Sequence, residues 1–254
     1  MPQLCVKDIY EWLNNIAPFD QSEEFDNVGL LIGRMDQAVS GVMVALDITP
    51  DVILEAAKAN ANLLISHHPL MFQPIQRVLT NEYEGMLLSQ IIQHGMCLIA
   101  AHTNIDRTTF SGSARLADVL NLHGTMHAEP YLFIGCLHDP QPAGRLEAIL
   151  SDTLKTKVKR FGDPAAEIQK IAIAGGAYSE GYLQAAKMGA QALITGEVRH
   201  HHAVAAAQSG FVLFEAGHHV TEAPMAAFLA ECLQKHVNEL KYNVRVCALS
   251  SSPY

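Results

Sequence analysis

Hydrophobic and polar positions along the chain follow two patterns, short apolar runs and longer helical repeats. The first clear example has an apolar run at Val42–Leu46, a helical stretch that starts at Thr49 and Pro50, and a second apolar run from Leu63. A threonine hydroxyl can cap free amide groups and proline fits the first helical turn, so a helix is predicted from there to about Asn60. The segment is therefore interpreted as strand, helix and strand. The same patterns predict helices at 82–93, 113–122 and 145–154 and a strand at 97–101.

A repeat relates this segment to a later part of the chain. When Val44 is placed on Ile173, eight residues of the first segment face identical residues: Ala45, Leu54, Ala56, Ala57, Lys58, Ala61, Leu64 and Ile65. A duplicated strand–helix–strand unit predicts an α/β fold with a mostly parallel sheet in each half and helices on both faces of each sheet, which makes three layers. We expect an internal duplication with halves at approximately 1–125 and 126–254, facing one another across a shared cleft.

Composition limits the classes of function. With 49% hydrophobic residues, the chain is not intrinsically disordered. Seventeen Lys and Arg residues stand against 26 Asp and Glu residues, a net charge of -9. This charge argues against non-specific attraction to nucleic acid or to an anionic membrane surface. No stretch approaches the roughly 18 uncharged apolar residues that a membrane span requires.

The N-terminus and the cysteines suggest the cellular compartment. Residues 1–19 carry three charged residues among their apolar positions, which predicts an amphipathic helix rather than a signal peptide. The five cysteines show no CxxC spacing, and Cys97 and Cys136 lie in apolar runs. They are interpreted as reduced core thiols. The sequence therefore predicts a soluble, cytoplasmic protein.

Residue types that bind metal ions follow three of the apolar runs. These residues are His67 and His68 after LLIS, His102 and Asp106 after CLIAA, and His218 and Glu222 after VLFEAG. The spacing between histidine and carboxylate is the same in the second and third stretches. Functional residues gather at the carboxyl ends of parallel strands, so these side chains are expected at such an edge. A His-His pair alone is most often two loop histidines, and the prediction rests on the three stretches together.

The donor types indicate which ions the site would hold. Imidazole suits zinc, iron and nickel, whereas carboxylates also accept manganese or magnesium. The donors outnumber the three protein ligands of a single catalytic zinc, so two divalent ions are expected. Glu222 is the expected bridge between them, because its longer side chain reaches further than that of Asp106.

Two other interpretations concern the kind of site and its acid–base groups. A structural metal site is usually closed, four-coordinate and rich in cysteine. None of the cysteines lies in the three stretches, which favours an open, reactive site. Glu197, after the apolar run ALIT, occupies the place that His68 takes in the first half. It is expected either to support a ligand or to act as a general acid or base. The catalytic residues stay open, with Glu222, Glu197 and His102 as candidates.

Five motifs, spread over nearly the whole chain, resemble those of one known family. They are DNVGL (26–30), SHHPLMF (66–72), HTNID (102–106), TGE (195–197) and GHHVTE (217–222). Together they resemble the GTP cyclohydrolase I type 2 homologue family, also called Nif-three-like. The chain resembles the short form, without the domain that longer members insert between the halves.

The resemblance implies an assembly and a ligand set. It implies two intertwined α/β halves with a dinuclear metal site between them, and a ring-shaped homohexamer built as a trimer of dimers. By motif, His68 and Asp106 would hold one ion and His67 and His218 the other. Glu222 would touch both ions. His102 matches an additional histidine of the family's site.

Two functions from different classes follow. The first is a di-metal hydrolase in which a metal-bound hydroxide attacks a nucleotide or a related small substrate. GTP cyclohydrolase activity is attributed to some family members, and phosphoester hydrolysis is chemically compatible with the same site. The alternative is a non-catalytic, metal-binding ring that acts as a scaffold or regulatory protein.

Overall fold

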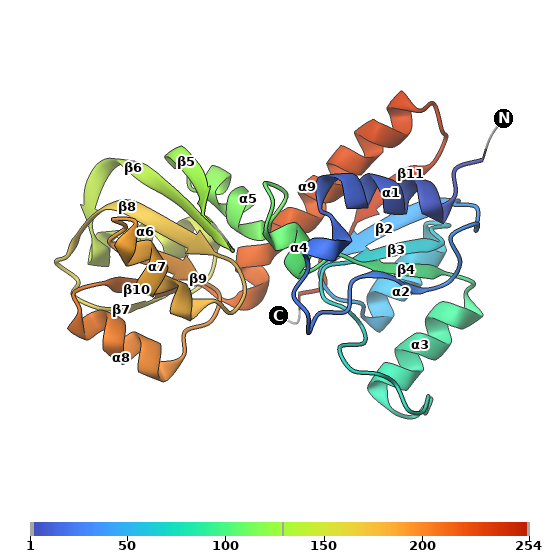
Figure 1. Ribbon diagram of the computed structural model, residues 1–254, viewed down its shortest axis with the longest axis horizontal. Helices are drawn as coiled ribbons and strands as arrows, with labels where there is room; N and C mark the ends of the chain where they lie inside the picture. The colour runs from blue at the N-terminus through green and yellow to red at the C-terminus, as the bar shows by residue number, and fades with distance from the viewer. Residues whose placement is uncertain (1–2, 129, 253–254) are drawn as a thin grey trace. The chain divides into compact units, whose positions relative to one another are not determined.

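The computed structural model describes residues 3–128 and 130–252 and has a mixed α/β fold with two sheets. The chain divides into two compact units (Figure 1). Unit 1 comprises Met1–Ile105 and Ala226–Tyr254, and unit 2 comprises Asp106–Met225. These boundaries differ from the predicted repeat halves, 1–125 and 126–254. The halves describe a sequence repeat and stay a prediction.

Unit 1 contains a five-stranded sheet. Its strands, in spatial order, are β1 (Gly29–Ile32), β4 (Cys97–Ala100), β3 (Leu63–Ser66), β2 (Gly41–Ala45) and β11 (Arg245–Ala248). Neighbouring strands are parallel, except that β1 runs antiparallel to β4. The expectation of a mostly parallel sheet is therefore confirmed for this unit.

Helices cover both faces of this sheet. Helices α2 (Pro50–Lys58) and α3 (Tyr83–Gln93) share one buried apolar cluster with β2, β3 and β4. Helix α1 (Val6–Ile16) and the unit 1 part of α9 (His218–Glu239) lie on the other side, as Figure 1 shows. The short elements η1 (Phe19–Gln21) and α4 (Thr103–Asp106) also begin in unit 1.

The local signals in the sequence act as expected. The Thr49 hydroxyl accepts a hydrogen bond from the backbone N–H of Val52, 3.2 Å away, and Pro50 is the first residue of α2. Gly95 follows α3 with a φ of 63°, a backbone conformation in which glycine is unstrained, and β4 begins two residues later. The predicted helices at 50–60 and 82–93 are therefore confirmed to within a few residues.

Unit 2 contains a six-stranded sheet between two pairs of helices. Its strands, in spatial order, are β5 (His123–Ala128), β6 (Leu132–Pro142), β8 (Glu167–Ala174), β9 (Ala192–Thr195), β10 (Val212–Glu215) and β7 (Lys159–Phe161). One buried cluster joins the sheet to α5 (Gly112–Val119) and α6 (Ala143–Leu154). Another joins it to α7 (Tyr182–Lys187), which follows η2 (Ser179–Gly181), and to α8 (His200–Gln208). Unit 2 is therefore three-layered.

The expectation of a mostly parallel sheet is wrong for unit 2. Strand β8 is parallel to β9 and β9 to β10, but β5–β6, β6–β8 and β10–β7 are antiparallel pairs. The connection from β5 to β6 is too short for the crossover that a parallel pair requires. The pairs β6–β8 and β10–β7 do have helices between their strands, so their antiparallel direction does not follow from the strand–helix–strand pattern.

The two sheets share part of their topology. In unit 1 the parallel strands run β2–β3–β4 with antiparallel β1 beside β4, and in unit 2 they run β8–β9–β10 with antiparallel β7 beside β10. The alignment of Val44 with Ile173 places β3 opposite β9. This shared order is the one expected if the repeat in the sequence corresponds to a repeat in the fold.

The described helices also test one expectation about membranes. None of them combines the length and the apolar character that a membrane crossing requires.

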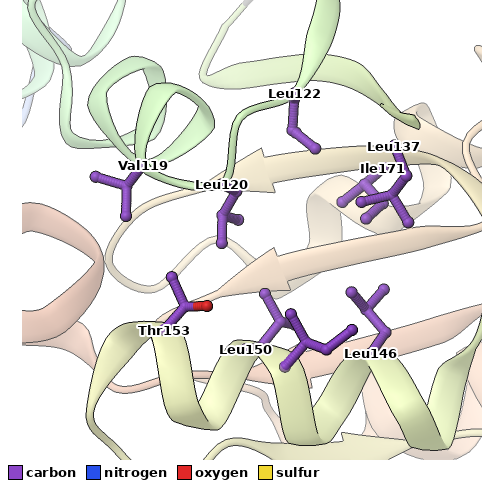
Figure 2. Close-up of a pocket in the computed structure, with 9 residues that line it drawn as sticks. Val119, Leu120, Leu122, Leu137, Leu146, Leu150, Thr153 and Ile171 are labelled. Carbon is purple, nitrogen blue, oxygen red and sulfur yellow. The ribbon is translucent and has the colours of Figure 1, made fainter. Parts of the chain in front are cut away.

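An apolar pocket of about 90 Å³ lies in unit 2 between α5, α6, β6 and β8 (Figure 2). Its lining side chains are apolar apart from one hydroxyl: Val119, Leu120, Leu122, Leu137, Leu146, Ile149, Leu150, Thr153 and Ile171. Leu146 and Leu150 on α6 are fully buried and face this space, whereas Ile149 is 41% exposed.

Substitution of Leu150 tests how tightly this part of the core is packed. We expect Leu150→Ala to lower the free energy of unfolding by about 2–5 kcal/mol, because lost apolar contacts and an enlarged cavity both destabilise the fold. Leu183→Ala, at a 55% exposed leucine on α7 that does not line the pocket, is the matched control and should cost less than about 1 kcal/mol. Urea unfolding followed by circular dichroism measures both. Equal losses would show that the pocket side of α6 carries no special share of the packing.

Candidate metal centre

Three histidines of unit 1 form a cluster, called here the histidine cluster. His67 and His68 follow β3, and His102 follows the neighbouring parallel strand β4. The ring centroids are 4.9 Å apart for His67–His68, 5.0 Å for His67–His102 and 5.5 Å for His68–His102. One ring nitrogen of each lies within 4.8 Å of those of the other two. The expected gathering at the strands' carboxyl ends is present within this unit.

Each ring of the histidine cluster is oriented through Nδ1. The Nδ1 atom of His67 lies 2.9 Å from the carbonyl oxygen of Ala101, that of His68 lies 2.8 Å from Oδ1 of Asp47, and that of His102 lies 2.9 Å from Oδ1 of Asp26. A carbonyl or an ionised carboxylate only accepts hydrogen bonds, so Nδ1 must carry the proton and donate it. In the neutral ring the lone pair is then on Nε2, the form in which imidazole binds a metal ion.

The carboxylate behind His102 is held with particular precision. Asp26 also accepts hydrogen bonds from the backbone N–H of Thr103, 3.0 Å away, and from the Thr103 hydroxyl, 2.5 Å away. Burial alone would raise the pKa of Asp26, but the hydrogen bonds from His102 and Thr103 outweigh it and lower the pKa to about 2. Asp26 is therefore ionised at neutral pH and remains an acceptor for His102.

Unit 2 contains a histidine and a carboxylate one helical turn apart, called here the His–Glu pair. His218 begins α9, and Oε2 of Glu222 lies 3.2 Å from Nε2 of His218. The Nδ1 atom of His218 lies 2.7 Å from Oε1 of Glu197. With Nδ1–H donated to Glu197, a neutral His218 would direct a lone pair at the Glu222 carboxylate. A proton or a metal ion between the two atoms removes this repulsion, so the donor pair fits a shared cation.

Glycines allow the Glu222 carboxylate to approach the strand ends. Gly176, just past β8, has a φ of 62°, and a Cβ atom there would collide with Oε1 of Glu222. A Cβ atom on Gly112 would lie 2.8 Å from Cα of Glu222. The hydroxyl of Thr221 accepts a hydrogen bond from the Gly176 N–H at 3.1 Å and so ties α9 to this loop. Glu222 is only 5% exposed as a result.

Two further predicted site residues are Asp106 and Glu197. Asp106 ends α4 and is the first residue of unit 2, half-buried. Glu197 contacts a predicted ligand, His218, and its role as a supporting or an acid–base group stays a prediction. The assignment of all five predicted ligands to one centre stays a prediction.

Sequence reasoning missed two carboxylates, Asp26 and Asp47, as functional residues. Asp47 stands two residues past the end of β2, and the rule that located the histidines also applies to that position. Asp26 lies in a loop before β1, and the rule that places functional residues after the carboxyl ends of strands does not apply there. Only its place within the DNVGL motif marked it out.

Imidazoles oriented by carboxylates at the ends of strands define the chain as an α/β protein with a metal-type donor site. The chain matches the Duf34/NIF3 (NGG1p interacting factor 3) family over residues 4–253 and belongs to that family. The resemblance found in the motifs is thereby confirmed.

Known proteins similar to this chain carry consistent names. The "GTP cyclohydrolase 1 type 2 homolog" of Clostridium acetobutylicum is 27% identical over 96% of this chain and 94% of the relative. The protein of the same name from Clostridium perfringens is 29% identical over 92% of each. The crystal structure of Staphylococcus aureus protein SA1388 is 27% identical, with a TM-score of 0.92 over 99% of this chain and 98% of the other.

Removal of the negative charge behind His218 should weaken metal binding. We expect Glu197→Gln to lower the affinity for zinc by about ten-fold or more. A carboxylate that accepts the Nδ1–H of His218 orients the imidazole ring and raises the basicity of Nε2. Competition with a chromophoric chelator measures the affinity. Glu180→Gln is the matched control, since Glu180 lies 4.0 Å from His202, a histidine outside the predicted ligand set. Equal affinities of wild type and Glu197→Gln would contradict the role given to Glu197.

The carboxylate of Asp26 should contribute to stability in a pH-dependent way. Its folded pKa of about 2 lies below the value of about 3.9 for an unfolded chain. The contribution is therefore fully present above about pH 4 and is lost as the pH falls towards 2. We expect metal-free Asp26→Asn to be less stable than wild type at about pH 7 and the difference to shrink by about pH 3. Urea unfolding at both values measures it, and a constant difference would contradict the pKa argument.

Proposed function

We propose that the chain is a metal-dependent hydrolase with two divalent ions held by His67, His68, Asp106, His218 and Glu222. One observation carries the proposal: each of four imidazoles, the histidine cluster and His218, has its Nδ1 atom within 2.9 Å of an acceptor. Scattered surface histidines rarely share such an arrangement, whereas metal ligands require it.

The division of ligands follows the family's pattern. His68 and Asp106 would hold one ion, His67 and His218 the other, and Glu222 would bridge them. The chain course supports a shared centre. It passes from unit 1 to unit 2 between Ile105 and Asp106, and it returns three residues after Glu222. Both points at which the chain passes between the units therefore lie close in sequence to proposed ligands. A duplication would place one histidine-bearing strand end in each unit. It would thereby account for the equal spacing of His102 to Asp106 and of His218 to Glu222.

The donor set suits certain ions better than others. A site with three imidazoles favours zinc, iron or nickel, whereas its carboxylates also accept manganese or magnesium, of which magnesium prefers oxygen ligands throughout. When bound, such ions acidify water and polarise a substrate oxygen.

The protein's own residues would supply orientation and proton transfer. Asp47 and Glu197 keep His68 and His218 in the tautomer that binds metal. The Glu197 carboxylate is 61% exposed, so it can exchange protons with solvent as well as hold His218. His102, held by Asp26, is placed to orient or protonate a substrate rather than to complete the ligand set.

The substrate class follows from chemistry and from the relatives. The relatives are named as homologues of GTP cyclohydrolase 1 type 2, and hydration of a purine imidazole ring is compatible with two Lewis-acidic ions. We propose a nucleotide or related small substrate. Hydrolysis of a phosphoester on the same substrate class is the competing reaction.

Metal content and turnover test this function together. We expect wild type reconstituted with zinc to retain about two ions per chain, and Glu222→Ala to lose at least one, because a bridging carboxylate contributes to both sites. Mass spectrometry of the metal content measures this, and chromatography measures turnover of GTP and a phosphoester panel. His201→Ala, at an exposed histidine outside the proposed ligand set, should behave as wild type. Turnover that survives Glu222→Ala would sink the proposed catalytic site.

Burial of the donors favours one second candidate, a non-catalytic metal-binding scaffold. His67 is 2% exposed and Glu222 is 5% exposed, which suits tight retention of ions. Retained metal without turnover of any substrate in the panel would favour this function over hydrolysis. The ring-shaped homohexamer stays a prediction under either function.

A further inference from the structure

An exposed phenylalanine stands beside the histidine cluster. The Phe72 ring centroid lies 5.7 Å from that of His102, with the ring planes at 79°. Phe72 is nevertheless 46% exposed. Its edge-to-face contact uses only part of the ring, and a large apolar surface next to a predicted reaction centre remains in contact with solvent. An exposed aromatic face beside the predicted ligands is a surface on which a flat ligand group can pack.

The loop that contains Asp26 and Asn27 contacts both His102 and the backbone next to Phe72. Asp26 accepts the hydrogen bond from Nδ1 of His102, and the next residue, Asn27, donates from its side-chain amide to the carbonyl oxygen of Met71, 2.6 Å away. Met71 immediately precedes Phe72. Two adjacent residues therefore hold the ring of His102 and the backbone immediately before Phe72. A preorganised ring costs less entropy when a ligand binds to it.

We infer that Phe72 is the platform on which a planar aromatic ring of the substrate stacks. This inference rests on the proposed function and names the part of the substrate that the site recognises. A flat, rigid phenyl face matches a flat heterocycle better than a flexible aliphatic chain, and stacking tolerates any base. A substrate whose heterocycle lies on Phe72 has its polar edge close to His102 and the neighbouring imidazoles. Phe72 thus selects for heterocyclic substrates and takes no part in the chemistry.

The experiment compares two probes that differ only by the base. GMP and ribose 5-phosphate are bound to zinc-loaded protein and measured by equilibrium dialysis, and the zinc content of every sample is determined first. Wild type should bind GMP about ten-fold more tightly than ribose 5-phosphate or better, because a stacked base contributes that much. Phe72→Leu, which keeps an apolar cover over His102 but has no ring, should bring the ratio close to one. Phe72→Trp should retain it.

Tyr83→Leu is the matched control, because Tyr83 is 62% exposed on α3, in the same region of the chain, and should leave the ratio unchanged. Equal binding of the two probes by wild type overturns the inference, as does an unchanged ratio in Phe72→Leu. Failure of the proposed function has a different signature, since wild type would then retain no zinc or would retain zinc without turning over any substrate of the panel. A Phe72→Leu protein that keeps its zinc but loses the ratio supports the inference and shows that the substitution has not unfolded the site.

Discussion

The tautomer of four histidine rings is the constraint on which the rest of the site depends. A neutral imidazole in water exchanges its proton between two nitrogens and rotates freely, so only part of the population can present Nε2 to a metal ion. In this fold His67, His68, His102 and His218 each donate Nδ1–H to a fixed acceptor. The lone pairs on Nε2 are thereby set in advance. The rings are therefore oriented when the chain folds, before any ion would bind.

The acceptors are available because of strand order. Strands β3 and β4 are parallel neighbours with Ser66 paired to Ala100, so the carbonyl of Ala101 comes alongside His67. Strand β2 lies on the other side of β3, and the residue that accepts from His68, Asp47, follows it. In unit 2, Glu197 follows β9 and His218 follows its parallel neighbour β10. The same topological feature therefore orients histidine rings in both units.

Close packing positions the carboxylates as firmly as hydrogen bonding positions the rings. Glu222 occupies space that side chains at Gly112 and Gly176 would fill, and the helix that carries it is tied to the β8 loop through Thr221. Asp26 remains ionised because four hydrogen-bond donors surround its buried carboxylate: Nδ1–H of His102, the N–H and hydroxyl of Thr103 and the N–H of Asn27. A buried carboxylate without such donors would take up a proton and would no longer orient its histidine.

Local pattern was enough to predict much of this protein. The apolar runs, the cap at Thr49 and the repeat between the segments around Val44 and Ile173 predicted the parallel strands and their helices, because hydrophobic periodicity and capping act over a few residues. The same reasoning located the histidines and Glu222 at strand ends. Tertiary structure alone decided the antiparallel pairing of β6 with β8 and of β7 with β10, because the partners in each pair lie far apart in sequence. It also decided the roles of Asp26 and Asp47, since an acceptor is recognised by the ring that reaches it and not by its neighbours along the chain.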